Sequence, residues 1–137
     1  MSLNTDYLKQ ILKTLGGSLK ALERYDKRSD EFDMFSDSIV REFEKAMETA
    51  GKLLRKSLIP YMSSSKAAWK LTYRDLFRQA ARHSLLTIEE VERWLIYRDN
   101  RDTPDNDSEE KLNDGTLKIL PGFISDARRL AEVLENA

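Results

Sequence analysis

The most constraining feature of this sequence is a stretch of about 27 residues in which apolar side chains recur every three or four positions. They are Phe32, Phe35, Ile39, Phe43, Ala46, Met47, Ala50, Leu54 and Leu58. This spacing places them on one face of an α-helix, which Pro60 then ends. At 1.5 Å per residue the helix is about 40 Å long, a length typical of helical bundles. The chain is therefore expected to consist of long helices that pack side by side.

A second apolar stripe, nearer the start of the chain, predicts another helix over residues 8–22. Asn4 or Thr5 can cap it, because both side chains accept hydrogen bonds from the unpaired amides of a first turn. The pair Gly16 and Gly17 lies inside this helix, where each glycine costs about 1 kcal/mol relative to alanine. We expect the helix to continue through the pair, with a neighbouring element packed closely against it.

Two capping-box patterns predict shorter helices in the second half of the chain. Thr72 with Asp75 and Thr87 with Glu90 have the spacing in which a hydroxyl and a carboxylate each bond a free amide of the first turn. The first pattern introduces a short helix. The second introduces a helix that is expected to run to about Asp99.

Two segments are expected to lie between helices, residues 61–68 as a connection or a frayed helix start and residues 101–108 as a loop. Residues 61–68 contain three consecutive serines, and residues 101–108 contain a Thr-Pro pair whose first residue is disfavoured in a helix. Ser108 is predicted to cap a last helix that is interrupted at Gly115 and kinked or broken at Pro121. The expected fold is therefore an all-α, antiparallel, up-and-down bundle of four to five helices, forming a single domain over residues 1–137.

The composition narrows the classes of function. With 23 Lys and Arg against 24 Asp and Glu, the net charge of −1 provides no overall attraction to nucleic acid or to an anionic membrane. Cysteine is absent, which excludes disulfides and thiolate metal sites and favours a cytoplasmic protein. No apolar run approaches the ~18 residues of a membrane span, and the N-terminal sequence lacks the build of a signal peptide. Glycine-rich phosphate loops are also absent, so we expect no nucleotide hydrolysis.

His83 is the only histidine, which excludes paired-histidine metal motifs and the Glu-x-x-His pattern of di-iron bundles. We expect this imidazole to be solvated or to cap the end of a helix, where a cation is favourable. Neither a metal site nor a cofactor is predicted.

Five cations spaced four residues apart would share one face if the segment that holds them were helical throughout: Lys66, Lys70, Arg74, Arg78 and Arg82. A solvated face is the simplest interpretation of this spacing. However, Arg78 and Arg82 lie in a predicted helix and can meet phosphates or an acidic partner.

A second polar cluster ends the fourth predicted helix, where Arg98 and Arg101 are adjacent to Asp99 and Asp102. These residues can pair with one another or bind a ligand, and the sequence leaves both interpretations open. The acidic residues that follow, at positions 102–114, are interpreted as loop solvation and as favourable charge at a helix N-terminus.

Three segments, taken in order, resemble the nucleotidyltransferase substrate-binding proteins, a branch of the HEPN class related to the HepT toxins. The first is SDSIVREFEKAMETAGKLLRKSL at residues 36–58, the second YRDLFRQAARHSLL at 73–86, and the third EEVERWLIYRDNRDTPDN at 89–106. The resemblance covers residues 6–134. Gly51 stands where the long helix of the family has a tryptophan, so looser packing is expected there.

The family pattern ends in R-x-x-x-x-H-x-Y, between the fourth helix and the last. Its arginine falls on Arg101, its histidine on Asn106 and its tyrosine on Ser108. In the toxin relatives this motif resembles a metal-independent ribonuclease site. Asn106 can hydrogen-bond a phosphate or a base edge, but an amide cannot serve as a general acid or base. Ser108, at the position where some partners attach AMP, is expected to cap a helix.

The resemblance implies a homodimer that partners a separately encoded minimal nucleotidyltransferase. We therefore interpret the chain as a non-catalytic substrate-binding subunit with a nucleotide or RNA ligand. The residues expected to hold the substrate or the partner are Arg98, Asp99, Arg101, Asp102, Asn106, Arg78 and Arg82.

Two alternatives remain open on the sequence. One is an active ribonuclease toxin that uses Arg101 and Asn106, with His83 taking the place of the missing histidine. The other is a helical interaction module without any link to nucleotides, in which the resemblance reflects bundle packing alone.

An apolar face that a second copy of the chain would cover is expected as well, because short bundles of long amphipathic helices often leave one exposed. The candidates are Phe32, Phe35, Trp69 and Trp94, and the alternative for each is the core of the monomer.

Overall fold

Residues 3–102 and 109–136 are described by the computed structural model, with the backbone alone for residues 101, 102 and 109–112. Within these ranges the chain forms six α-helices and one short 3-10 turn, and no β-strand. They are α1 (Asp6–Leu22), α2 (Asp30–Leu58), η1 (Ile59–Tyr61), α3 (Ser65–Lys70), α4 (Tyr73–Arg82), α5 (Ile88–Asp102) and α6 (Glu109–Glu135). The predicted all-α bundle is therefore confirmed, with five longer helices and the short α3.

Helix α2 is the one that the long apolar stripe predicts. The hydroxyl of Ser29 accepts a hydrogen bond from the amide of Phe32 at 3.1 Å and so caps its first turn. Acidic side chains in that turn suit the positive end of the helix dipole. The apolar face of α2 is buried from Ile39 to Leu58, and the chain leaves the helix through η1, which contains Pro60.

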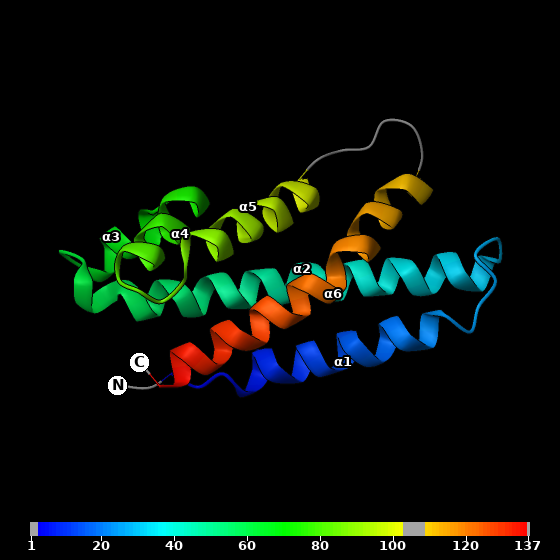
Figure 1. The fold of residues 1–137 in the computed structure, drawn as a ribbon, viewed down its shortest axis with the longest axis horizontal. Helices are drawn as coiled ribbons and strands as arrows, with labels where there is room; N and C mark the ends of the chain where they lie inside the picture. Colours follow the sequence, from blue (N-terminus) through cyan, green and yellow to red (C-terminus); the bar gives the residue numbers. More distant parts are fainter. Residues whose placement is uncertain (1–2, 103–108, 137) are drawn as a thin grey trace.

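The helices form two connected groups (Figure 1). Helices α1 and α2 are antiparallel neighbours, and α6 crosses α2 and returns to the start of α1, so that these three helices contact one another. Helices α4 and α5 form an antiparallel pair on the other side of α2 from α1, and α5 also contacts α6. Helix α2 therefore packs against helices of both groups.

Aromatic rings join the two groups in the core. The ring of Phe123 on α6 lies 4.9 Å from that of Phe43 on α2, and 5.5 and 5.6 Å from those of Trp94 and Tyr97 on α5, all close to perpendicular. Phe77 on α4 stacks on Trp94 at 5.3 Å. Because Trp94 is fully buried within the monomer, its prediction as part of an exposed face is wrong.

The other candidates for an exposed apolar face differ from Trp94. Phe32 and Phe35 are half-buried and pack against the core, whereas Trp69 on α3 is exposed. Phe32 and Phe35 pack against the core because they belong to the apolar stripe of α2, which faces α1 and α6.

One boundary prediction is confirmed in part and another is corrected. Residues 61–68 contain a helix start, one of the two interpretations predicted for them, since Ser64 accepts a hydrogen bond from the amide of Ala67 at 3.0 Å and starts α3. Helix α6 is not interrupted at Gly115 and is not broken at Pro121. Buried residues on both sides of Pro121, including Leu120 and Phe123, hold the helix in place across the missing amide. Figure 1 shows α6 changing direction part-way along its length.

Two glycines of α6 allow α5 to approach closely. A Cβ added at Gly115 would lie 3.1 Å from Oδ1 of Asn100, and one added at Gly122 would lie 3.2 Å from the hydroxyl of Tyr97. The glycine predicted to interrupt α6 is thus a packing residue. In α1 the opposite holds, because Gly16 and Gly17 have no neighbour closer than 3.7 Å to an added Cβ. The helix continues through this pair as predicted, but without the close approach that we expected.

A hydrogen bond and an ion pair join the start of α1 to the end of α6. Thr5 occupies the N-cap position of α1, but its buried hydroxyl bonds the carboxylate of Glu135, which also pairs with Lys9. Asn4, the other predicted cap, accepts a hydrogen bond from the amide of Asp6 at 2.9 Å. The hydrogen bond between Lys9 and Glu135 raises the pKa of the lysine and lowers that of the glutamate.

Candidate functional site

Arg98 is the predicted binding residue whose surroundings the structure describes in most detail. It lies near the end of α5, where its guanidinium carbon is 4.4 Å from the centre of the Tyr73 ring. Its side chain is half-buried and its Nε atom is buried. Tyr73 is the first residue of α4, so the start of one helix of the antiparallel pair supports the end of the other.

A hydrogen bond to α2 fixes the side chain of Tyr73. Its hydroxyl donates a hydrogen bond to the backbone carbonyl of Met47 at 3.1 Å. A Cβ added at Gly51 would lie only 2.7 Å from this hydroxyl, so the ring occupies the space that any larger residue would need. The looser packing predicted around Gly51 is therefore wrong, because a side chain from α4 fills the position.

The remaining residues of the predicted cluster extend beyond the described side chains. Asp99 is exposed beside Arg98 on α5. The helix runs on to Asp102, three residues further than predicted, so the backbone of Arg101 and Asp102 is helical. Their side chains lie outside the described residues, and so do Asn106 and Ser108 entirely.

Arg78 and Arg82 are exposed on α4, one turn apart. Arg82 is the last residue of that helix and lies about 13 Å along the axis from Tyr73, and thus from the support of Arg98. Arg98 and Arg82 are therefore at different ends of the α4 and α5 pair. The five-cation stripe is also divided, because residues 71 and 72 separate α3 from α4.

His83 occupies the C-cap position of α4, as one of its two predicted interpretations required. Its ring stacks on that of Tyr61 at 4.1 Å. The next helix carries residue 101 about 20 Å beyond Ile88, which begins α5 five positions after His83. Within one chain, the imidazole consequently lies at the opposite end of α5 from the backbone of Arg101.

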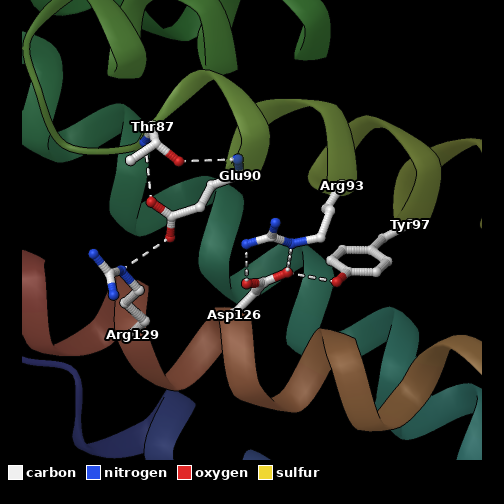
Figure 2. A network of polar contacts seen from close by, with 6 residues as sticks. All are labelled: Thr87, Glu90, Arg93, Tyr97, Asp126 and Arg129. Atoms are coloured by element: carbon white, nitrogen blue, oxygen red, sulfur yellow. Dashed lines mark hydrogen bonds and ion pairs between the residues drawn. The ribbon is translucent and has the colours of Figure 1, made fainter.

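A polar network that the sequence analysis missed joins α5 to α6 (Figure 2). Arg93 donates two hydrogen bonds to the carboxylate of Asp126, both at 2.9 Å, and Tyr97 donates a third at 2.5 Å. Asp126 is buried, whereas Arg93 has 48% of its side chain exposed. A signal for this network existed, because Asp126 interrupts the apolar face of α6 between Phe123 and Ala127.

The predicted capping box of α5 lies in the same interface between α5 and α6, which is called the polar seam below. The amide of Thr87 donates to Glu90 at 3.0 Å, and the amide of Glu90 donates to the hydroxyl of Thr87 at 3.1 Å. The second carboxylate oxygen of Glu90 lies 3.2 Å from Nε of Arg129 on α6 (Figure 2). One carboxylate thus starts a helix and also fixes that helix to its neighbour.

The pKa values identify the protonation states within the network. Burial raises the pKa of Asp126, but the hydrogen bonds from Arg93 and Tyr97 outweigh burial and leave it below the ordinary value. Burial and the nearby carboxylate raise the pKa of Tyr97. At neutral pH the aspartate is therefore ionised and the phenol is neutral, an arrangement that holds two helices together and offers no group ready to exchange a proton.

An open groove of about 510 Å³ runs beside this network on α5 and α6. Its cationic side chains are Arg93, Arg128 and Arg129, and its anionic ones are Asp126 and Glu132. Because Arg93 is neutralised by Asp126 and Arg129 by Glu90, the groove has little excess charge to attract an anion.

The described part of the chain holds neither a cluster of metal ligands nor a membrane-spanning helix. Among the side chains that the structure describes, no three of His, Cys, Asp or Glu come together in a way that could hold a metal ion. None of the helices in those ranges has the length and apolarity needed to cross a membrane.

Comparison with known proteins gives one match. Residues 9–136, almost the whole chain, match the family described as "Nucleotidyltransferase substrate binding protein like". No curated protein and no solved structure matches the chain. The match covers every helix of the described bundle except the first residues of α1. The chain therefore belongs to the nucleotidyltransferase substrate-binding protein-like family.

Proposed function

We propose that this chain is a cytoplasmic, non-catalytic and homodimeric subunit that binds substrate for a separately encoded minimal nucleotidyltransferase. The observation that carries the proposal is the family match over residues 9–136. The binding site in this proposal is the end of α5 with the segment that follows, formed by Arg98, Asp99, Arg101, Asp102 and Asn106. Arg78 and Arg82 would extend it along α4.

The non-catalytic part of the proposal is supported by the chemistry of the motif. Asn106 stands where a proton-transferring histidine would be needed, and an amide does not titrate near neutral pH. The position of His83 beside the start of α5, far along the helix from the backbone of Arg101, also supports a site that works without an imidazole. Binding through arginine requires neither group.

The homodimer is supported by apolar side chains that the monomer leaves exposed. Ile88 and Ile96 on α5 are 70% and 58% exposed, and their separation of eight residues places them within about 80° of each other around the helix. Covering such residues is favourable in a symmetric dimer. A light-scattering mass near twice 15.9 kDa at micromolar concentration is expected, and a mass near 15.9 kDa would count against the dimer.

The test of the proposed function is to tag the chain, purify it from its own cells in low salt and identify the bound proteins by mass spectrometry. We expect a small nucleotidyltransferase in near-equal amount. The absorbance spectrum of the complex reports bound nucleic acid. A lone dimer that carries RNA, together with growth arrest that Arg101→Ala abolishes, would instead support the ribonuclease alternative.

The site is tested separately with the double variant Arg98→Ala and Arg101→Ala. We expect it to lose the partner or the substrate, since both cations are removed. A complex that forms with unchanged affinity would show that the site lies elsewhere, even if the partner is correct.

A further inference from the structure

We propose that Tyr73 is a positioning residue, which holds the guanidinium of Arg98 so that its N–H edge meets a phosphate or carboxylate group. The inference rests on the proposed function, because it requires Arg98 to bind substrate or partner. It adds a residue from α4, and through that residue Gly51 of α2, to a site that had been predicted at the end of α5.

The first step concerns which part of Arg98 the contact uses. The guanidinium carbon lies 4.4 Å from the centre of the Tyr73 ring, well within the ~6 Å of a cation–π contact. Arginine commonly makes such a contact with the flat face of its guanidinium. The N–H edge is the part that recognises carboxylate and phosphate with two parallel hydrogen bonds. A contact of the Arg98 guanidinium through its face is therefore compatible with simultaneous binding of such an anion.

The second step concerns the rigidity of the support. The hydroxyl of Tyr73 donates to the carbonyl of Met47 at 3.1 Å, and its ring lies 5.6 Å from that of Phe77, which is buried. The hydroxyl of Tyr73 is thus held by α2, and its ring packs against a buried ring of α4. An arginine that rests on a fixed ring loses less conformational freedom on binding than one in solvent, and this difference increases affinity.

The third step concerns Gly51, which is buried in α2 beneath Tyr73. An added Cβ would lie 2.7 Å from the hydroxyl and 3.3 Å from Cζ of the ring. Any side chain at this position must displace the ring, and Arg98 with it. Gly51 therefore determines the position of a binding arginine that is on another helix, and its replacement tests the support without touching the ligand.

The experiment compares four variants with a matched control. Gly51→Ala displaces the ring, Tyr73→Leu removes it, Tyr73→Phe keeps it without the hydroxyl, and Arg98→Ala removes the supported group. Gly17→Ala is the control, because this helical glycine is exposed and has nothing within 4 Å of an added Cβ. Circular dichroism melts establish that each variant is folded at the temperature of the assay.

The first measurement needs no partner. The Nε–H of Arg98, assigned by its absence from the NMR spectrum of Arg98→Ala, is expected to be shifted upfield by the Tyr73 ring. The shift should persist in Tyr73→Phe and Gly17→Ala, decrease in Gly51→Ala and vanish in Tyr73→Leu. A signal that is the same in the wild type and in Tyr73→Leu would overturn the inference.

The second measurement is the dissociation constant for the nucleotidyltransferase that co-purifies with the tagged chain. We expect at least a tenfold increase for Arg98→Ala, an increase of several-fold for Tyr73→Leu and Gly51→Ala, and little change for Tyr73→Phe and Gly17→Ala. If Arg98→Ala weakens binding and Tyr73→Leu does not, the inference alone is wrong. If Arg98→Ala also has no effect, the proposed site fails together with it.

Discussion

Two interfaces of α6 differ in the chemistry that holds them. Against α1 and α2, helix α6 buries mainly apolar side chains, such as Phe123 against Phe43, and its polar contacts there come from Asn113 and Glu135 near its two ends. Against α5 it adds directional contacts, because Asp126 accepts three hydrogen bonds from Arg93 and Tyr97, and Asn100 donates to Thr116 at 2.9 Å. An apolar surface tolerates small shifts between helices, whereas a bidentate ion pair is formed in one register only.

The two interfaces of α6 therefore contribute differently to the stability of the fold and to the position of its helices. The apolar interface provides most of the stability, since burial scales with area. The polar seam fixes the position of α5 along its axis relative to α6. Substitutions in the apolar interface should therefore lower the free energy of unfolding most. Substitutions in the polar seam should lower it less, but they should alter the register of α5 against α6.

The largest effect is expected for Phe123→Ala, because this ring contacts both α2 and α5. The free energy of unfolding should fall by about 3–5 kcal/mol, as measured by urea denaturation. Leu12→Ala, a buried change confined to α1, serves as the comparison and should cost about 2–5 kcal/mol. A loss below 1 kcal/mol for Phe123→Ala would contradict a core shared by the two groups of helices.

A smaller loss, of about 1–3 kcal/mol, is expected for Asp126→Asn. The variant replaces the ionised acceptor of Arg93 and Tyr97 with a neutral amide, while Arg93 is exposed enough to regain water. Asp114→Asn, an exposed change on the same helix, is the control and should alter stability by less than about 0.5 kcal/mol. Equal effects of the two substitutions would show that the seam adds no stability.

The pH dependence of stability tests the same carboxylate without removing it. The pKa of Asp126 is lower in the folded chain than its ordinary value of 3.8, so the network stabilises the fold above that pH. This contribution should be lost as the pH falls through the folded pKa. Urea unfolding between about pH 2 and 6 should therefore show a steeper acid decline for the wild type than for Asp126→Asn. Parallel curves would contradict this assignment.

The smallest effect is expected for Thr87→Ala, which removes the hydroxyl that caps α5. The loss should be about 1 kcal/mol in urea denaturation, and hydrogen exchange in the first turn of α5 should become faster. Thr49→Ala removes a hydroxyl that bonds only the carbonyl of Lys45 at 2.8 Å within α2, and it should change stability by less than about 0.5 kcal/mol. A larger loss for Thr49→Ala would argue against the cap as the cause.

The apolar stripe of α2 and the helix caps could be predicted from the sequence, and the pairing of Asp126 with Arg93 and Tyr97 could not. The stripe of α2 and the caps at Thr72 and Thr87 depend on neighbours three or four residues away, which a sequence displays directly. Asp126 shows only that a charge lies on an apolar face. Its partner Arg93 becomes evident once α5 is known to pack there, because the pairing depends on tertiary structure.

The candidate site was predicted to the same limited extent. Its arginines could be named from the motif and from local charge, but the support of Arg98 by Tyr73 depends on how α4 and α5 meet. The separation of Arg82 from Arg98 has the same origin. Gly51 illustrates the limit, since its sequence suggested a gap and the fold fills that gap from another helix.

The return of α6 to the start of α1 affects how the chain folds during synthesis. Helices α1 and α2 leave the ribosome before α6, so the apolar faces that they present to α6 stay uncovered until α6 has emerged. A nascent chain of this protein therefore exposes the apolar surface of the α1 and α2 hairpin throughout the translation of α3, α4 and α5. This is the interval in which binding of a chaperone to that surface would do most to prevent aggregation.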